Sequence, residues 1–227
     1  MLTRTAIRNV SQGQPATQPH RVPPPGATQT GAIELMGACM SLANAEIYGE
    51  NEPAEYLYKV VSGTVRTYKV LVDGRRQIGA FHLPGDIFGF ETEDVHTFSA
   101  EAITECKITV IKRSAVMALA ARDNEVARQM WTLTARELAR VQEHSLMLIK
   151  SAEERVAGFL LEMADRVPGG GAVELPMSRQ DIADYLGLTI ETVSRTLKHL
   201  EDAAAIEVPK CRRILLRNRS ALRRLNA

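Results

Sequence analysis

The sequence predicts an α+β protein: a β-rich unit, then a long helix, then a compact unit of helices and short strands. Short apolar segments separated by Gly, Asp and Pro fill residues 31–112. Residues 114–150 lack Gly and Pro, and a Pro-Gly-Gly-Gly break at 168–171 interrupts the last unit. We therefore expect a flexible tail at 1–30, a β-roll at 31–113, a long helix at 114–150 and a separate unit at 151–227.

The strands of the first unit are predicted from Val, Ile, Tyr and Thr enrichment. Asp73-Gly74 lies between two apolar segments and indicates a tight hairpin, because such a turn requires positive φ. Many short strands at this spacing indicate a sandwich or a β-roll. The expected strands are 56–61, 64–72, 77–83 and 107–111.

The helical stretch contains a heptad seam of alternating three- and four-residue steps, which is typical of helices that pair side by side. The alternative is a helix lying on its own sheet. Both hold if residues 114–127 pack on the sheet and residues 131–148 meet a second chain, and we expect a homodimer on this basis. The seam comprises Trp131, Thr134, Leu138, Val141, Ser145 and Leu148.

The last unit contains two short predicted helices joined by a sharp turn. Ser178 is an N-cap for the first helix and Thr189 for the second, since each hydroxyl accepts an orphan backbone N–H. Ala183 is small where the helices must cross, Gly187 suits the turn, and Val193 faces back onto the first helix. This arrangement over 178–200 predicts a helix-turn-helix, a DNA-binding motif.

The second helix exposes Ile190, Glu191, Ser194 and Arg195, which we expect to contact base edges. Glu accepts from cytosine N4, Arg donates two bonds to guanine, and Ile packs on a thymine methyl. The alternative is a solvated face with an i,i+4 ion pair.

Residues that flank the reading positions are expected to contact phosphates. A basic turn at 210–213 would act as a wing, although a solvated hairpin tip is equally consistent with the sequence. The predicted backbone contacts are Arg179, Thr189, Thr192, Lys198, Lys210 and Arg212.

Cys211 lies between Lys210 and Arg212, and cationic neighbours make a thiol more reactive. One hypothesis is a redox thiol whose oxidation repels phosphate and prevents DNA binding. The alternative is an inert thiol packed under the wing.

Composition restricts the remaining function classes. The net charge is +1, yet residues 208–227 carry seven Lys and Arg and no acid, as expected of a local basic face. The three cysteines suggest no disulfide framework and no metal site, and no apolar run is long enough for a membrane helix. We expect a cytoplasmic protein with no membrane partner. With no nucleophile–base pair and no phosphate-binding loop, we do not expect an enzyme.

Over about residues 45–225 the chain resembles the CRP/FNR family, the cyclic AMP receptor protein and FNR regulators of bacteria. The similar segments are 52–63, Pro84-Gly85-Asp86-Ile87-Phe88-Gly89, 178–183 and Glu191-Thr192-Val193-Ser194-Arg195. The resemblance implies a cyclic-nucleotide-binding-like β-roll, a dimerisation helix at 114–150 and a C-terminal winged helix-turn-helix. It also implies a homodimer that binds double-stranded DNA and contacts RNA polymerase.

Departures from family patterns point to a subgroup without a cofactor. Phe98-Ser99-Ala100 stands where cyclic-nucleotide members carry Arg-Ser-Ala, and Phe does not neutralise a phosphate. Residues 1–30 lack the cysteine cluster of oxygen-sensing members. The recognition stretch is most similar to the FixK group, which implies activation of microaerobic or nitrogen-fixation genes at TTGA-type inverted repeats. The alternative is a regulator of this family that responds to a cyclic nucleotide or another small molecule.

Overall fold

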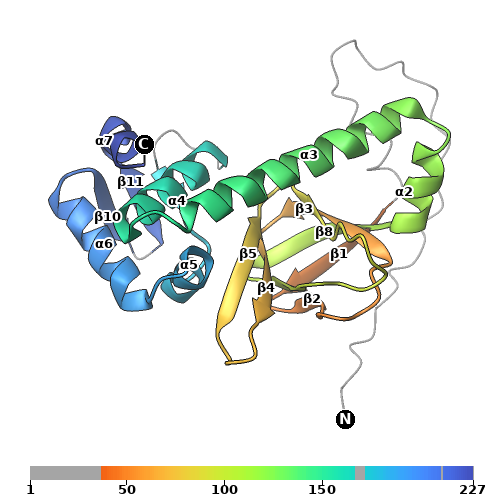
Figure 1. Ribbon diagram of the computed structural model, residues 1–227, viewed down its shortest axis with the longest axis horizontal. Coiled ribbons are helices and arrows are strands. Elements are labelled where there is room, and N and C mark those ends of the chain that lie inside the picture. The colour runs from red at the N-terminus through yellow and green to blue at the C-terminus, as the bar shows by residue number, and fades with distance from the viewer. Residues whose placement is uncertain (1–36, 167–171, 211, 227) are drawn as a thin grey trace.

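The computed structural model describes residues 37–166, 172–210 and 212–226. A β-roll, a long helix and a smaller unit at the far end of that helix follow one another (Figure 1). This confirms the predicted α+β class and the order of its parts. The tail at 1–30 and the thiol of Cys211 lie outside the described residues.

The β-roll consists of two antiparallel four-stranded sheets. One has the order β1-β8-β3-β6 and the other β2-β7-β4-β5. The four strands predicted from sequence are β3, β4, β5 and β8. The strand bounds are β1 Ala38–Ala43, β2 Glu46–Tyr48, β3 Tyr56–Ser62, β4 Val65–Val70, β5 Arg76–His82, β6 Ile87–Phe88, β7 Ser99–Ala102 and β8 Glu105–Lys112.

The two sheets share a core, because alternate side chains of each strand point inward. Val60 and Ile108 from one sheet, and Val65 and Ala100 from the other, are fully buried in one cluster. The β4–β5 connection is the predicted tight turn, with Gly74 at a φ of 84°. These strands therefore follow from local sequence signals.

The helical stretch is divided into α2, Arg113–Ala120, and α3, Asn124–Met147. The sequence indicated one long helix here. The division has a local cause: the Asp123 carboxylate accepts the amides of Glu125 and Val126 and so starts a new helix. Val126 is buried against the β-roll, together with Val116 of α2. This is the expected packing of the first part of the stretch on its own sheet.

In its described residues, the unit after α3 combines four helices with a small sheet of order β10-β11-β9. Helix α7 was not expected from sequence; the Asn218 side chain caps it by accepting the Ala221 amide. In the described part of the chain, no helix is both long and apolar enough to span a bilayer. The bounds are α4 Ala152–Arg166, β9 Ala172–Glu174, α5 Arg179–Leu186, α6 Ile190–Asp202, β10 Ile206–Lys210, β11 Arg213–Leu216 and α7 Arg219–Leu225.

Candidate nucleic-acid interface

Helices α5 and α6 form the predicted helix-turn-helix. The Ser178 hydroxyl accepts the Asp181 amide, and the Asp181 carboxylate accepts the Ser178 amide, which completes a capping box. Gly187 ends α5 in the left-handed conformation, with a φ of 62°, where a side chain would be strained. The Thr189 hydroxyl then accepts the Thr192 amide and caps α6.

The two helices cross through a buried apolar contact. Ala183 and Val193 are fully buried, and Leu197 and Leu200 of α6 join the same core. The burial of these positions turns the opposite side of α6 toward solvent. Ile190, Glu191, Ser194 and Arg195, here called the reading face, are all exposed.

A residue that the sequence did not single out holds the turn between the helices. Arg155 of α4 donates from Nη1 to the carbonyl oxygen of Leu186 at 2.8 Å and, less closely, to that of Gly187 at 3.4 Å. These carbonyls lie at the C-terminal end of α5, where a cation is favourable. The only signal for this role would have been a cation on the face of α4 that packs on the motif.

The charges on α6 favour an ionised reading face. The pKa of Glu191 is held below its usual range by its own backbone amide and by the Thr189 hydroxyl. Glu191 is therefore a hydrogen-bond acceptor at neutral pH, which suits a cytosine amino group. Lys198 Nζ lies 3.0 Å from Asp202 and 3.4 Å from Glu201, so it forms ion pairs within α6.

The predicted phosphate-contacting residues lie around this face. Thr189 is exposed, and Thr192 is half-buried with its hydroxyl 3.1 Å from that of Thr189. Arg179 is half-buried in the first turn of α5. Lys210 and Arg212 are exposed at the β10–β11 turn, which forms the wing.

Two family models match the chain: a Crp-like helix-turn-helix domain at residues 154–225 and a cyclic nucleotide-binding domain at residues 42–123. The nitrogen fixation regulation protein FixK of Azorhizobium caulinodans is 55% identical over 190 residues, covering 81% of this chain and 77% of that protein. This chain belongs to the CRP/FNR family of transcription regulators.

Further relatives place this CRP/FNR protein near the FixK group. FixK of Rhizobium meliloti is 44% identical over 181 residues, covering 79% of this chain and 82% of that protein. The solved structure of FixK2 from Bradyrhizobium japonicum has a TM-score of 0.81 and 52% identity, covering 84% of this chain and 98% of that chain. The predicted family and subgroup are confirmed, and the CRP/FNR protein is a DNA-binding transcription regulator.

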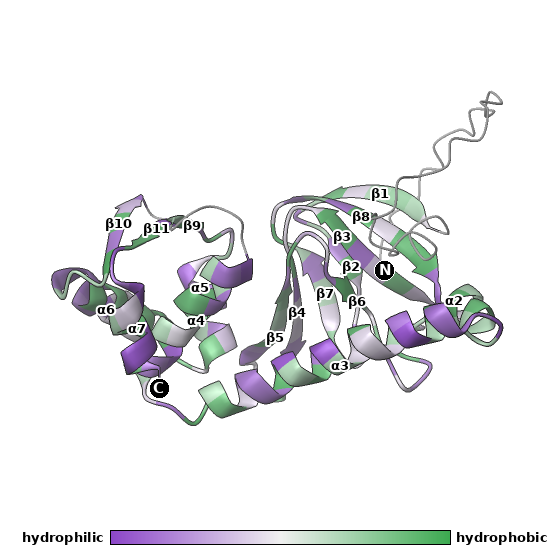
Figure 2. Ribbon diagram, turned by 90° about the horizontal axis from the view of Figure 1, so that it is seen from above, coloured by the Kyte–Doolittle hydropathy of each residue, from purple (hydrophilic) through white to green (hydrophobic). Residues whose placement is uncertain are grey.

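The predicted seam lies on the open side of α3 in the CRP/FNR protein. Trp131 is 76% exposed, Leu138 57% and Val141 53%, and Thr134 and Ser145 are also exposed. Figure 2 shows apolar residues recurring along α3 between polar ones. Leu148 differs from these exposed residues, because it is the C-cap of α3 and is half-buried. Its side chain lies close to Gly187: a methyl group added at Gly187 would be 3.7 Å from Leu148 Cδ2.

A cavity of about 240 Å³ lies between the β-roll and α3. Phe98, which we expected at the position where cyclic-nucleotide members carry Arg, lines it and lies beside Gly79. The described lining residues include the carboxylates Glu91 and Glu137 but no Arg or Lys. Burial raises the pKa of Glu137. This lining is unfavourable for an anionic phosphate.

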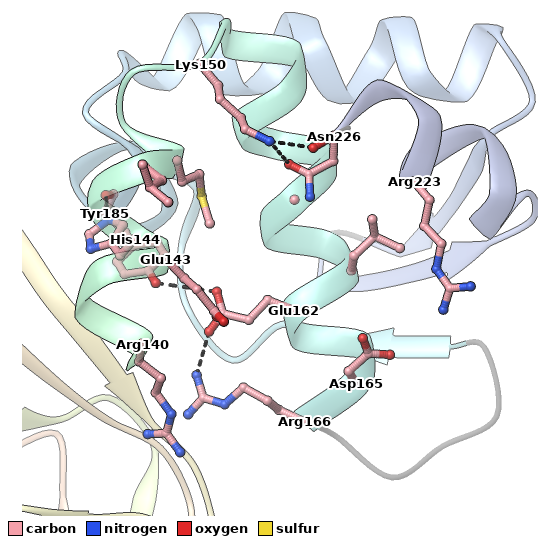
Figure 3. Close-up of a pocket in the computed structure, with 14 residues that line it drawn as sticks. Arg140, Glu143, His144, Lys150, Glu162, Asp165, Arg166, Tyr185, Arg223 and Asn226 are labelled. Atoms are coloured by element: carbon pink, nitrogen blue, oxygen red, sulfur yellow. Dashed lines mark hydrogen bonds and ion pairs between the residues drawn. The ribbon is translucent and has the colours of Figure 1, made fainter. Parts of the chain in front are cut away.

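A second cleft of about 650 Å³ lies where α3, α4 and α7 meet (Figure 3). Its charged side chains are largely paired: Arg166 with Glu162 at 2.9 Å, and Lys150 with the backbone and side-chain oxygens of Asn226. The His144 ring stacks on Tyr185 with centroids 4.1 Å apart, and its Nε2 donates to the Tyr185 carbonyl. These contacts join α3 to the DNA-binding unit.

Proposed function

We propose that this chain is a homodimeric activator that binds a TTGA-type inverted repeat without a small-molecule cofactor. The observation that carries the proposal is the reading face on α6, with Glu191, Ser194 and Arg195 exposed together above a buried inner side. Glu191 would accept from cytosine, and Arg195 would donate to guanine, in a major groove. Ile190 would contact a thymine methyl.

The half-buried and exposed hydroxyls and cations around α6 support a set of phosphate contacts. The DNA backbone on either side of the reading face would be bound by Arg179, Thr189, Thr192 and Lys198. Lys210 and Arg212 would do so from the wing, because both are exposed at the β10–β11 turn.

The exposed apolar seam of α3 supports dimer formation. Trp131 and Leu138 are large apolar side chains exposed on the same face of the helix, and such a face is typical of a protein–protein contact. Each seam residue would pair with its counterpart in a second chain. The seam residues are Trp131, Thr134, Leu138, Val141, Ser145 and Leu148. A two-fold dimer would place two reading helices roughly 34 Å apart, one turn of DNA.

The names of two relatives support a proposal about the regulated genes. The FixK proteins of Azorhizobium caulinodans and Rhizobium meliloti are named as regulators of nitrogen fixation. By similarity, we propose control of nitrogen-fixation or microaerobic genes in the cytoplasm, through contact with RNA polymerase. The cavity lined by Phe98 has no Arg or Lys among its described lining residues, which supports activity without a cyclic nucleotide.

Selection of bound DNA from a random pool, with purified full-length protein and no added ligand, tests the proposal. We expect an inverted repeat with TTGA-type half-sites. A selected pool without symmetry would contradict the dimer. Binding that requires added cyclic AMP or cyclic GMP would contradict cofactor-free recognition.

A further inference from the structure

Helix α5 of the helix-turn-helix lies against strand β5 of the β-roll in both ribbon views (Figures 1 and 2). Two arginines of the β4–β5 hairpin make ion pairs across this contact. Arg76 Nε lies 2.7 Å from Asp184 Oδ2, and Arg76 Nη2 lies 2.7 Å from Asp181 Oδ1. Arg66 Nη1 lies 2.5 Å from the same Asp181 oxygen.

The carboxylate of Asp181 has two separate tasks. Its Oδ2 accepts the amide and the hydroxyl of Ser178 and so closes the cap of α5. Its Oδ1 accepts both guanidinium groups of the β-roll. The first turn of α5 is therefore tied to the hairpin through a single side chain.

These ion pairs are shielded from water. The side chains of Arg66, Asp181 and Asp184 are 13%, 6% and 12% exposed, and that of Arg76 is 24% exposed. Arg66 also binds Glu101 at 2.7 Å. Charge-assisted bonds of this kind are directional, and low exposure weakens their screening by salt.

An apolar contact lies beside the ion pairs. Phe81 of β5 packs on Tyr185 of α5 and Phe159 of α4, with ring centroids 5.2 and 6.3 Å apart. Apolar burial favours contact between the two units but is not directional. The ion pairs supply the direction that this contact lacks.

A fixed α5 also fixes α6, because the two helices share Ala183 and Val193 in one buried contact, and Arg155 binds the turn between them. We propose that Arg66 and Arg76 are positioning residues for DNA recognition. Through Asp181 and Asp184 they set the orientation of the reading face relative to the dimer helix, without an effector. This inference rests on the proposed binding to an inverted repeat.

The consequence is a preference for one half-site spacing. If the orientation of each α6 is fixed, a dimer fits two half-sites at one separation and loses affinity at others. If the orientation is loose, the same dimer accepts several separations. Contact with a single half-site does not depend on the orientation.

The test uses charge reversal at the Arg76–Asp184 pair in the full-length protein. Arg76→Glu and Asp184→Arg are each expected to reduce the discrimination between optimal and shifted spacings about tenfold, with half-site affinity unchanged. The double variant Arg76→Glu/Asp184→Arg should restore part of the discrimination, because the exchanged charges at 76 and 184 can pair again while the carboxylate at 76 still faces Asp181. Arg75→Glu is the matched control, since Arg75 is the adjacent residue, is 78% exposed and pairs with Asp73. Unchanged discrimination in the single variants, or no restoration in the double variant, overturns the proposal.

A measurement without DNA separates this proposal from the proposed function. Spin labels at Ser194→Cys and Lys107→Cys, with Cys39 and Cys211 replaced by Ser and the labelled chain diluted into an excess of unlabelled chain, report the distance between α6 and the β-roll within one protomer. We expect one narrow distribution for the otherwise wild-type chain, at least a twofold broadening in each single charge variant, and partial recovery in the double variant. Equally narrow distributions in all of them overturn the proposal whatever DNA the protein binds.

Discussion

Arg140 of α3 and Arg166 of α4 bind opposite oxygens of one carboxylate, that of Asp86 in the β-roll. Arg140 Nη2 lies 2.8 Å from Oδ1, and Arg166 Nη2 lies 2.5 Å from Oδ2. Oδ2 also accepts the Leu83 amide at 2.8 Å. Asp86 thus joins the β-roll, the long helix and the DNA-binding unit at one point.

Replacing Asp86 is expected to destabilise the protein. Burial alone would raise the pKa of Asp86, but Arg166, the Leu83 amide and Arg140 lower it below the usual range. The variant Asp86→Asn should reduce the free energy of unfolding by about 1.5–3 kcal/mol, the range for hydrogen bonds to charged groups. Urea denaturation measures this. Asp73→Asn, at an exposed carboxylate paired with Arg75, is the control and should leave the midpoint unchanged.

Arg195 and Lys198 should separate base reading from phosphate binding. Arg195→Ala is expected to weaken binding to the selected site by about 5- to 150-fold and to relax specificity at one guanine, because one bidentate contact contributes about 1–3 kcal/mol. Lys198→Ala should weaken binding to all sequences alike and reduce the salt slope by about 0.9 for each phosphate contact removed. Competition binding at several salt concentrations measures both. An unchanged site preference in Arg195→Ala would show that Arg195 does not read a base.

Leu138 tests the dimer seam. Leu138→Asp places a charge in the middle of the exposed seam of α3, and loss of two buried Leu side chains per dimer is expected to weaken dimerisation by at least about 100-fold. Sedimentation equilibrium measures the monomer–dimer constant. Arg136→Asp adds the same residue to the same helix at an exposed position off the seam, and its dimer should persist. Dissociation of both variants to the same extent would contradict this seam.

The buried histidine His82 predicts acid sensitivity. Burial, with Arg166 and Arg140 nearby, outweighs Asp86 and lowers the pKa of His82 to about 3. The unfolded chain binds this proton below about pH 6.5 and the folded chain does not. Stability is therefore lost as the pH falls below about 6.5, by up to about 1.4 kcal/mol per pH unit.

Substitution of His82 isolates this contribution, because His144 also has a lowered pKa, chiefly through burial. His82→Gln should make the fall in stability between pH 6.5 and pH 5 less steep by about one proton. Urea denaturation at several pH values measures the slope. His199→Gln replaces an exposed histidine and serves as the control. Equal slopes in wild type and His82→Gln would contradict a neutral folded-state His82.

Much of the DNA-binding site could be predicted because its signals are local. The caps at Ser178 and Thr189, the turn at Gly187 and the exposure of Arg195 each depend on residues within a few positions along the chain. The open seam of α3 follows from helical periodicity in the same way. Leu148 is the exception, since its half-burial depends on where the helix-turn-helix lies.

The sequence by itself determined the α+β class, the helix-turn-helix and the reading face, because short-range hydrogen bonding and apolar periodicity are written in neighbouring residues. The orientation of that face was decided only by tertiary structure. Arg66 and Arg76 lie 115 and 105 residues from Asp181, and Asp86 lies 80 residues from Arg166. No periodicity links such distant charges, and they become partners only when apolar burial brings the β-roll and the DNA-binding unit together.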